Sequence, residues 1–146
     1  MITTQGSQTG SSIKILLIED NDISRQLMTD FLTDCGYDVL ALAEASRFAS
    51  VVAEFAPNLI LLDLKLPNVD GFTLLQRLQV HPDWQAIPVI VISAYAYNTD
   101  KQRALTLGAR RYLVKPVRLT ELMDAILAET ACLASCGPVA INEYHQ

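Results

Sequence analysis

The sequence predicts an α/β domain in which five strands form one parallel sheet with helices on both faces. Five short apolar runs alternate with five segments whose apolar residues recur at helical spacing, which is the order of successive βαβ units. The runs are apolar at consecutive positions, as expected for strands that are buried on both faces of a parallel sheet. Right-handed crossovers between such strands place helices on both faces.

Length and composition fit one domain of this kind. The chain has 146 residues, 51% of them apolar, which is enough for one core and too few for two. A net charge of −5 without a long block of like charges does not indicate a nucleic-acid or anionic membrane surface. No run of 18 apolar residues could span a membrane, and residues 1–12 lack the features of a targeting signal. Because three sparse cysteines are typical of a reduced compartment, we expect a cytoplasmic protein.

The expected strands end at polar or charged residues. The third is the clearest, because Leu59 to Leu62 are all apolar, Asp63 follows them and Pro67 closes the run. Taken alone, Asp63 could be a helix cap or a solvated loop residue, but other strands end in the same manner. The five expected strands are 13–18, 39–42, 59–63, 89–92 and 112–114.

The expected helices lie between and after these strands, each with a start or a stop signal in the sequence. These signals are the capping residues Asn21, Asp22 and Asp70 and the terminating residues Gly36, Pro57, Pro82 and Gly108. The fourth helix is the weakest, at about 99–107, and the last fades around 132–137. Helical spacing predicts core-facing residues at Ile23, Leu27, Met28, Phe31 and Leu32, at Ala45, Phe48, Ala49, Val52 and Phe55, at Phe72, Leu75 and Leu78, and at Leu119, Leu122, Met123, Ile126 and Leu127.

Four strand ends bring reactive side chains to one edge of the predicted sheet. The first strand ends in Glu19 and Asp20, the third in Asp63, the fourth in Ser93 and the fifth in Lys115. The carboxyl ends of parallel strands form the edge at which open α/β folds bind ligands. Carboxylates about 5 Å apart repel one another by roughly 3 kcal/mol at an effective dielectric constant near 20. A Mg²⁺ ion with oxygen ligands would relieve this repulsion.

The lysine and the serine add donors that a group of carboxylates lacks. A cation, the Lys115 ammonium and the Ser93 hydroxyl together can hold the three oxygens of a transferring phosphoryl group. Asp63 would then be the nucleophile and would form an aspartyl phosphate.

The chain resembles a response-regulator receiver domain of the stand-alone chemotaxis or sporulation-relay type, used in two-component signalling. The resemblance implies a flavodoxin-like fold with strand order 2-1-3-4-5. It covers about residues 13–130, which we expect to form the domain between a flexible leader at 1–12 and a helix end and tail at 131–146. It rests on Ile18-Glu19-Asp20, Leu62-Asp63-Leu64-Lys65-Leu66-Pro67, Asp70-Gly71, Ser93-Ala94, Gly108-Ala109 and Lys115-Pro116.

The resemblance assigns a role to each site residue. Asp63 is the phosphoacceptor. Asp20, Asp63 and the backbone carbonyl of Lys65 ligate Mg²⁺, and Glu19 assists through a water molecule. The resemblance also implies that two further residues contact the phosphoryl group. Ser93 forms a hydrogen bond to one of its oxygens, and Lys115 pairs with another.

The resemblance also implies features outside the acidic cluster. The Lys115–Pro116 peptide bond is expected to be cis. Tyr112 matches the family's switch aromatic, and otherwise it is an ordinary half-buried tyrosine of a strand. When Asp63 is phosphorylated, we expect a charge-assisted hydrogen bond to draw Ser93 toward the phosphoryl group and Tyr112 to rotate inward into the vacated space. Arg110 and Arg111 replace the acidic pair that is typical of the dimerising transcription-factor subfamily.

The expected function is that of a single-domain response regulator. It accepts a phosphoryl group from a phosphohistidine of a histidine kinase or phosphotransfer protein, and signals through a protein contact or as a homodimer. An alternative is a relay intermediate that passes the group on. No turnover enzyme is expected beyond self-phosphorylation and slow dephosphorylation. The expected contact surface is the fourth helix, fifth strand and fifth helix, where Lys101, Arg103, Arg111 and Arg118 form either a docking face or a solvated one.

Other functions fit the sequence less well. Aspartyl-nucleophile phosphohydrolases carry a second acid two residues after the nucleophile, where this chain has Lys65. A nucleotide or flavin site needs a loop rich in donors after the first strand, and Glu19 and Asp20 would repel a phosphate there. A metal site at Cys132 and Cys136 would need more ligands at closer spacing, so two small thiols are the simpler interpretation.

Overall fold

The structure is a computed structural model that describes residues 12–134 of the chain. The leader expected at 1–12 and the tail expected at 131–146 lie outside the described residues, apart from Ser12 and residues 131–134. The side chains of Cys132 and Cys136 also lie outside the description, so the interpretation of the two thiols stays a prediction.

One parallel sheet forms the centre of the described structure. Its strand order is β3-β2-β4-β5-β6, which confirms the predicted order 2-1-3-4-5 counted along the chain. The strands are β2 (Lys14–Ile18), β3 (Asp38–Leu42), β4 (Leu59–Leu62), β5 (Val89–Ser93) and β6 (Arg111–Val114). Within residues 12–134 the helices are α1 (Asp22–Asp34), α2 (Phe48–Phe55), α3 (Gly71–Val80), α4 (Asn98–Thr106) and α5 (Leu119–Ala134).

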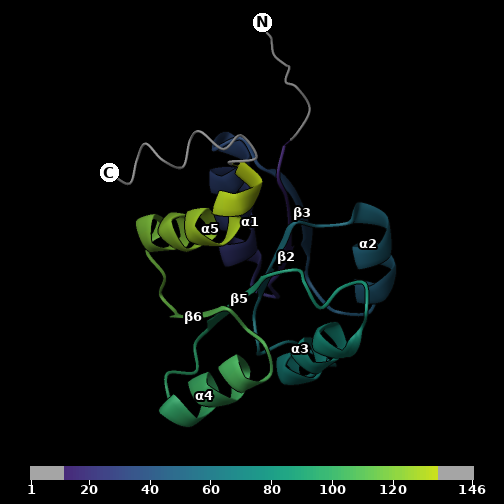
Figure 1. The fold of residues 1–146 in the computed structure, drawn as a ribbon. Coiled ribbons are helices and arrows are strands. Elements are labelled where there is room, and N and C mark those ends of the chain that lie inside the picture. The colour runs from purple at the N-terminus through teal and green to yellow at the C-terminus, as the bar shows by residue number, and fades with distance from the viewer. Residues whose placement is uncertain (1–11, 135–146) are drawn as a thin grey trace, which may run out of the picture.

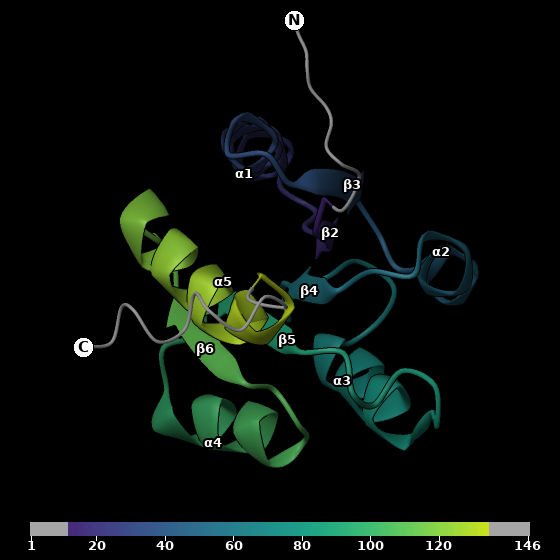
Figure 2. The same ribbon diagram turned by 45° about the horizontal axis from the view of Figure 1, so that its top comes forward.

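The helices form a layer on each face of the sheet. Figures 1 and 2 show α1 and α5 together on one face and α2, α3 and α4 on the other. Successive strand residues point to opposite faces, so Leu16 and Ile18 pack with α2, α3 and α4, whereas Ile15 and Leu17 pack with α1 and α5. All four residues of β4 are buried, because it is the middle strand and is covered on both sides.

The predicted capping residues Asn21, Asp70 and Gly36 lie at helix ends as expected, whereas Asp22 is the first residue of α1. The Asn21 side chain accepts a hydrogen bond from the Ser24 N–H at the start of α1, and Asp70 does the same for Phe72 at the start of α3. Gly36, just past α1, has a φ of 98°, a conformation that glycine adopts without strain.

Several predicted core positions are wrong. Ile23, Leu27 and Leu127 are 80%, 55% and 51% exposed. Each helical residue turns about 100° from the one before, and the buried stripe of α1 follows Met28 and Leu32, so Leu27 lies to one side of it.

The same narrowness of the buried stripe explains the other corrections. In α2 the stripe is Phe48, Val51 and Val52, and Ala49 is exposed. In α5, helical spacing predicted that Leu127 is buried, but Ala125 is buried and Leu127 is exposed. Helical spacing identified the right helices, but not the edges of their buried stripes.

No helix within residues 12–134 has the length and apolar character needed to cross a membrane.

Candidate functional site

Four neighbouring strands deliver the predicted site residues to the same edge of the sheet. Glu19 and Asp20 follow β2, Asp63 follows β4, Ser93 ends β5, and Lys115 follows β6. The strands are in register there, because Ile18 pairs with Leu62 and Ser93 pairs with Val114. The sheet therefore brings together residues that are up to 96 positions apart in the sequence.

Three carboxylates form the centre of this site. Carboxylate oxygens of Glu19, Asp20 and Asp63 all lie within 4.8 Å of one another. Glu19 and Asp63 are only 1% and 4% exposed, whereas Asp20 is exposed. Two of the three acids are thus removed from solvent, where their mutual repulsion is screened least.

Lys115 bridges the two buried carboxylates. Its Nζ lies 2.7 Å from Glu19 Oε1 and 3.0 Å from Asp63 Oδ2. Lys115 follows β6 and precedes Pro116, and the Lys115–Pro116 peptide bond is cis, as predicted. The ammonium compensates one of the three negative charges.

Burial and the ion pairs shift the pKa values of these groups. Burial raises the pKa of Glu19, and the Asp63 charge adds to this, although the hydrogen bond from Lys115 acts in the opposite direction. Burial alone would lower the pKa of Lys115, but Glu19 and Asp63 outweigh it and raise that pKa. Lys115 therefore stays charged at neutral pH, and the site favours positive charge.

The donor set fits a divalent cation. Three carboxylates and one ammonium leave a formal charge of −2, which one divalent ion would neutralise. All-oxygen ligands suit Mg²⁺. Asp20 is exposed, so an ion held by Asp20 and Asp63 would be open to solvent and would keep bound waters.

The loop after β4 holds Asp63 through its backbone. The Lys65 N–H donates to Asp63 Oδ1 over 3.0 Å, and the backbones of Lys65 and Asp70 form an antiparallel β-bridge across the loop. Gly71 closes this loop, since a Cβ there would lie 2.4 Å from Leu64 Cα. A side chain at position 71 would push the two ends of the loop apart.

Ser93 and Tyr112 are linked through a third residue. The Tyr95 N–H donates to Ser93 Oγ over 3.0 Å, and the Tyr112 hydroxyl donates to the Tyr95 carbonyl over 2.7 Å. Tyr112 is buried, and this burial raises the pKa of its hydroxyl. The ring of Tyr112 therefore lies inward in this structure, and a movement of Ser93 and Tyr112 on phosphorylation stays a prediction.

Some contacts of the site have no signal in the sequence. The Asn21 N–H donates to Glu19 Oε2 over 3.0 Å, and the N–H groups of Lys65 and Tyr95 hold Asp63 and Ser93. Every residue except proline carries such a donor, so residue type does not reveal it. The predicted basic group is also smaller than expected, because Arg103 lies 4.0 Å above the ring of Phe72 and faces α3.

Comparisons with known proteins agree with this geometry. The family model described as "Response regulator receiver domain" matches residues 15–127. An uncharacterized 14.6 kDa protein from the sodA1 3′ region of Leptolyngbya boryana is 35% identical over 127 residues, which cover 87% of this chain and 95% of that protein. Protein RcaC of Microchaete diplosiphon is 32% identical over 114 residues, or 78% of this chain.

Several of the relatives are much longer than this chain, whereas the solved structure described below is similar over almost its whole length. This chain spans 18% of RcaC and less than half of two further relatives. The BeF3-activated N-terminal receiver domain of Klebsiella pneumoniae RstA has a TM-score of 0.74 at 28% identity, covering 80% of this chain and 97% of that one.

Charge repulsion within the acidic cluster gives the first prediction. Asp20→Asn should raise the melting temperature of the metal-free protein, because it removes one of three mutually repelling charges. The gain in the free energy of unfolding should be at most about 1 kcal/mol, since solvent screens the exposed Asp20 carboxylate. Mg²⁺ should stabilise the wild type by about 2.7 kcal/mol at a hundred times its dissociation constant, and Asp20→Asn much less.

Thermal melts in EDTA and in a Mg²⁺ series measure both effects. Asp124→Asn, which removes an exposed acid of α5, is the matched control and should respond to Mg²⁺ like the wild type. An unchanged wild-type melt in millimolar Mg²⁺, with Asp20→Asn less stable than wild type, would contradict the prediction.

Proposed function

The chain belongs to the response regulator receiver domain family, and on that premise we propose that it accepts a phosphoryl group on Asp63 and signals through a protein contact. The donor in this proposal is the phosphohistidine of a histidine kinase or of a phosphotransfer protein. The observation that carries the proposal is the Lys115 ammonium, which lies between two buried carboxylates beside the exposed Asp20.

The reaction is a displacement at phosphorus. A carboxylate oxygen of Asp63 forms the new O–P bond while the P–N bond to the donor histidine breaks, and its electron pair stays on the imidazole nitrogen. The transferring group spreads its negative charge over three oxygens. Lys115 is in place to pair with one of them. Ser93 Oγ accepts from the Tyr95 N–H, and its hydroxyl group would donate to another of these oxygens.

A metal ion would supply the remaining positive charge. A bound Mg²⁺ supplies positive charge that neutralises the transferring group. Asp20, Asp63 and the backbone carbonyl of Lys65 would hold the ion, with Glu19 assisting through water. The formal charge of −2 in the cluster supports this assignment.

A small-molecule donor tests the acceptor residue. Acetyl phosphate with Mg²⁺ should add one phosphoryl group to the wild type, and Asp63→Asn should abolish the addition, because an amide is not a nucleophile of this kind. Intact-protein mass spectrometry measures the addition. Asp83→Asn, which changes an exposed acid in the turn after α3, is the control and should be labelled like the wild type. Equal labelling of Asp63→Asn would sink the assignment.

An apolar surface beside the site is suited to a donor protein. Ile23 and Leu27 are exposed on α1, although their spacing predicted burial. A groove of about 390 Å³ is lined by Leu27 and extends to the Lys115–Pro116 bond. It is lined by Ser24, Leu27, Met28, Ile92, Lys115, Pro116, Val117, Leu119 and Leu122. We infer that a helix of the donor packs here, because this places its phosphohistidine next to Asp63.

This inference separates two kinds of donor. Ile23→Ser with Leu27→Ser should slow transfer from a phosphorylated histidine kinase at least tenfold and leave labelling by acetyl phosphate unchanged, since the small molecule needs no docking surface. The kinase is the one from a panel that labels the wild type fastest. Val80→Ser, a 72% exposed position on α3, is the control. Equal slowing with both donors would point to damage at Asp63 instead.

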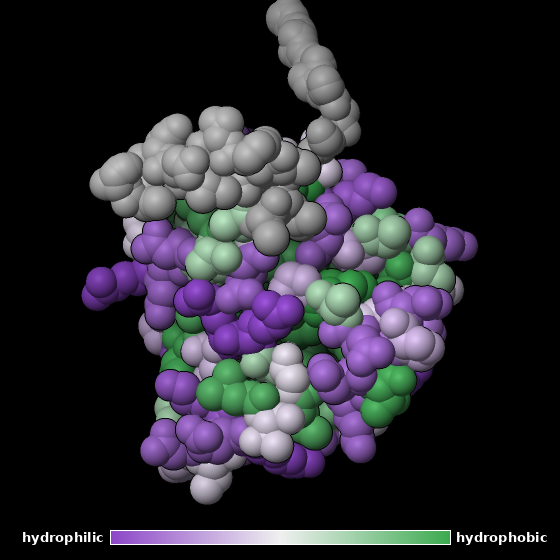
Figure 3. Space-filling model, viewed as in Figure 1, coloured by the Kyte–Doolittle hydropathy of each residue, from purple (hydrophilic) through white to green (hydrophobic). Residues whose placement is uncertain are grey.

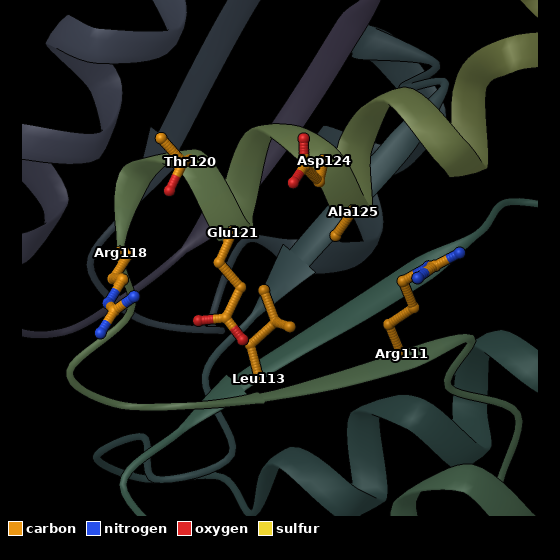
Figure 4. Close-up of a pocket in the computed structure, with 7 residues that line it drawn as sticks. All are labelled: Arg111, Leu113, Arg118, Thr120, Glu121, Asp124 and Ala125. Carbon is orange, nitrogen blue, oxygen red and sulfur yellow. The ribbon is translucent and has the colours of Figure 1, made fainter.

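The output surface in this proposal is formed by α4, β6 and α5. Figure 3 shows hydrophilic residues on this side of the molecule, with apolar and intermediate residues among them. Between β6 and α5 lies a groove of about 650 Å³, with Arg111 and Arg118 at opposite ends and Glu121 between them (Figure 4). Arg111 also pairs with Glu129 over 2.8 Å. Tyr112 lies on the same strand, so a change in its position would alter this surface.

Binding measured with and without beryllofluoride, as a mimic of the phosphoryl group, tests the surface. Tyr112→Ala and Arg111→Glu should each reduce the mimic-dependent gain in affinity or self-association by at least fivefold. Arg47→Glu, an equal charge reversal at the start of α2, should leave it unchanged. If neither Tyr112→Ala nor Arg111→Glu alters the gain for a confirmed partner, the output surface lies elsewhere.

A further inference from the structure

Arg25 makes three polar contacts around the loop that carries Asp20. It lies in the first turns of α1, and its Nη1 donates to the backbone carbonyl of Glu19 over 3.0 Å and, at 3.4 Å, to that of Asp20. Its Nη2 lies 2.6 Å from Asp22 Oδ1. One guanidinium thus joins α1 to the loop between β2 and α1, which consists of Glu19, Asp20 and Asn21.

The loop needs such support because the sheet stops just before it. The Glu19 N–H still donates to the Leu42 carbonyl, as the last bond on the β3 side. Beyond it, the carbonyls of Glu19 and Asp20 point to Arg25. The Glu19 carboxylate is held by Lys115 and by the Asn21 N–H. The exposed Asp20 carboxylate has no such bond among the described residues, so its backbone decides where it lies.

We propose that Arg25 is a positioning residue, which fixes the backbone of Glu19 and Asp20 so that the Asp20 carboxylate stays beside Glu19 and Asp63. This inference rests on the proposed metal site, and it assigns to Arg25 the preorganisation of that site before the ion binds. A loop free to turn away would relieve the repulsion among the acids and would have to be drawn back at a cost in metal affinity.

The shape of the guanidinium matters for this role. Arginine presents donors on a rigid planar fork, so it can bond backbone carbonyls and a carboxylate at once. Lysine keeps the charge but has a single nitrogen on a flexible stem. The pair with Asp22 alone is an exposed i,i+3 contact, with Asp22 86% exposed, and such pairs contribute little. The carbonyl contacts therefore carry the role.

Binding of Mn²⁺ alone, followed by the loss of the free-ion electron paramagnetic resonance signal, tests the proposal on the full chain. Arg25→Gln should weaken Mn²⁺ binding at least tenfold, and Arg25→Lys at least fivefold. Asp22→Asn removes only the ion pair, and Arg47→Gln removes only a distant charge, so both should stay within threefold of the wild type. Melting in EDTA should move by only a few degrees in all four variants.

The outcomes separate this inference from the function on which it rests. Wild-type protein that binds no Mn²⁺ overturns the metal site and the role of Arg25 together. Wild-type affinity in Arg25→Gln overturns the role of Arg25 alone, even if the metal-free protein has lost stability. Full rescue by Arg25→Lys overturns it too, because charge and not position would then be the cause. If Arg25→Gln does not fold, the affinity of Arg25→Lys decides.

Discussion

The rest of the site depends on the placing of three carboxylates at one edge of a parallel sheet with a single ammonium between two of them. Lys115 contacts Glu19 and Asp63, which are both buried, and the cluster keeps a formal charge of −2. A buried charge is tolerated when it is paired. The remaining negative charge of the cluster favours binding of a cation. A bound cation would in turn favour the negative oxygens of a phosphoryl group. The fold therefore determines the chemistry of the site by fixing this net negative charge at one edge of the sheet.

The scaffold holds the acids mainly through its backbone. Register between β2 and β4 sets Glu19 against Asp63, and the loop closed at Gly71 returns the Lys65 N–H to the Asp63 carboxylate. On the other side, Arg25 bonds the carbonyls before α1. Because of such support, the site needs little reorganisation when a ligand arrives.

The sequence predicts the strands and their polar ends well, because a short run of consecutive apolar residues such as Leu59 to Leu62 is typical of a strand that is buried on both faces. It predicts the helix faces less well. Ile23 and Leu27 have the right spacing for a core, yet α1 buries a stripe that passes beside them. Whether an apolar residue lies on that stripe depends on how the helix rests on the sheet, and no local pattern carries that information. The two misassigned residues also adjoin the candidate site. Arg103 was likewise misplaced, because the ring of Phe72 attracts its guanidinium.

The central claim is that Asp63 carries the transferred group, and chemical trapping tests it most directly. Borohydride reduces an acyl phosphate to an alcohol, so it converts a phosphorylated aspartate to homoserine. After transfer from a phosphorylated histidine kinase and reduction, peptide sequencing by mass spectrometry should find homoserine at position 63. It should be absent when EDTA is present during transfer. Homoserine at Asp20, or the corresponding alcohol of glutamate at Glu19, would contradict the account. Trapping that EDTA does not affect would contradict it too.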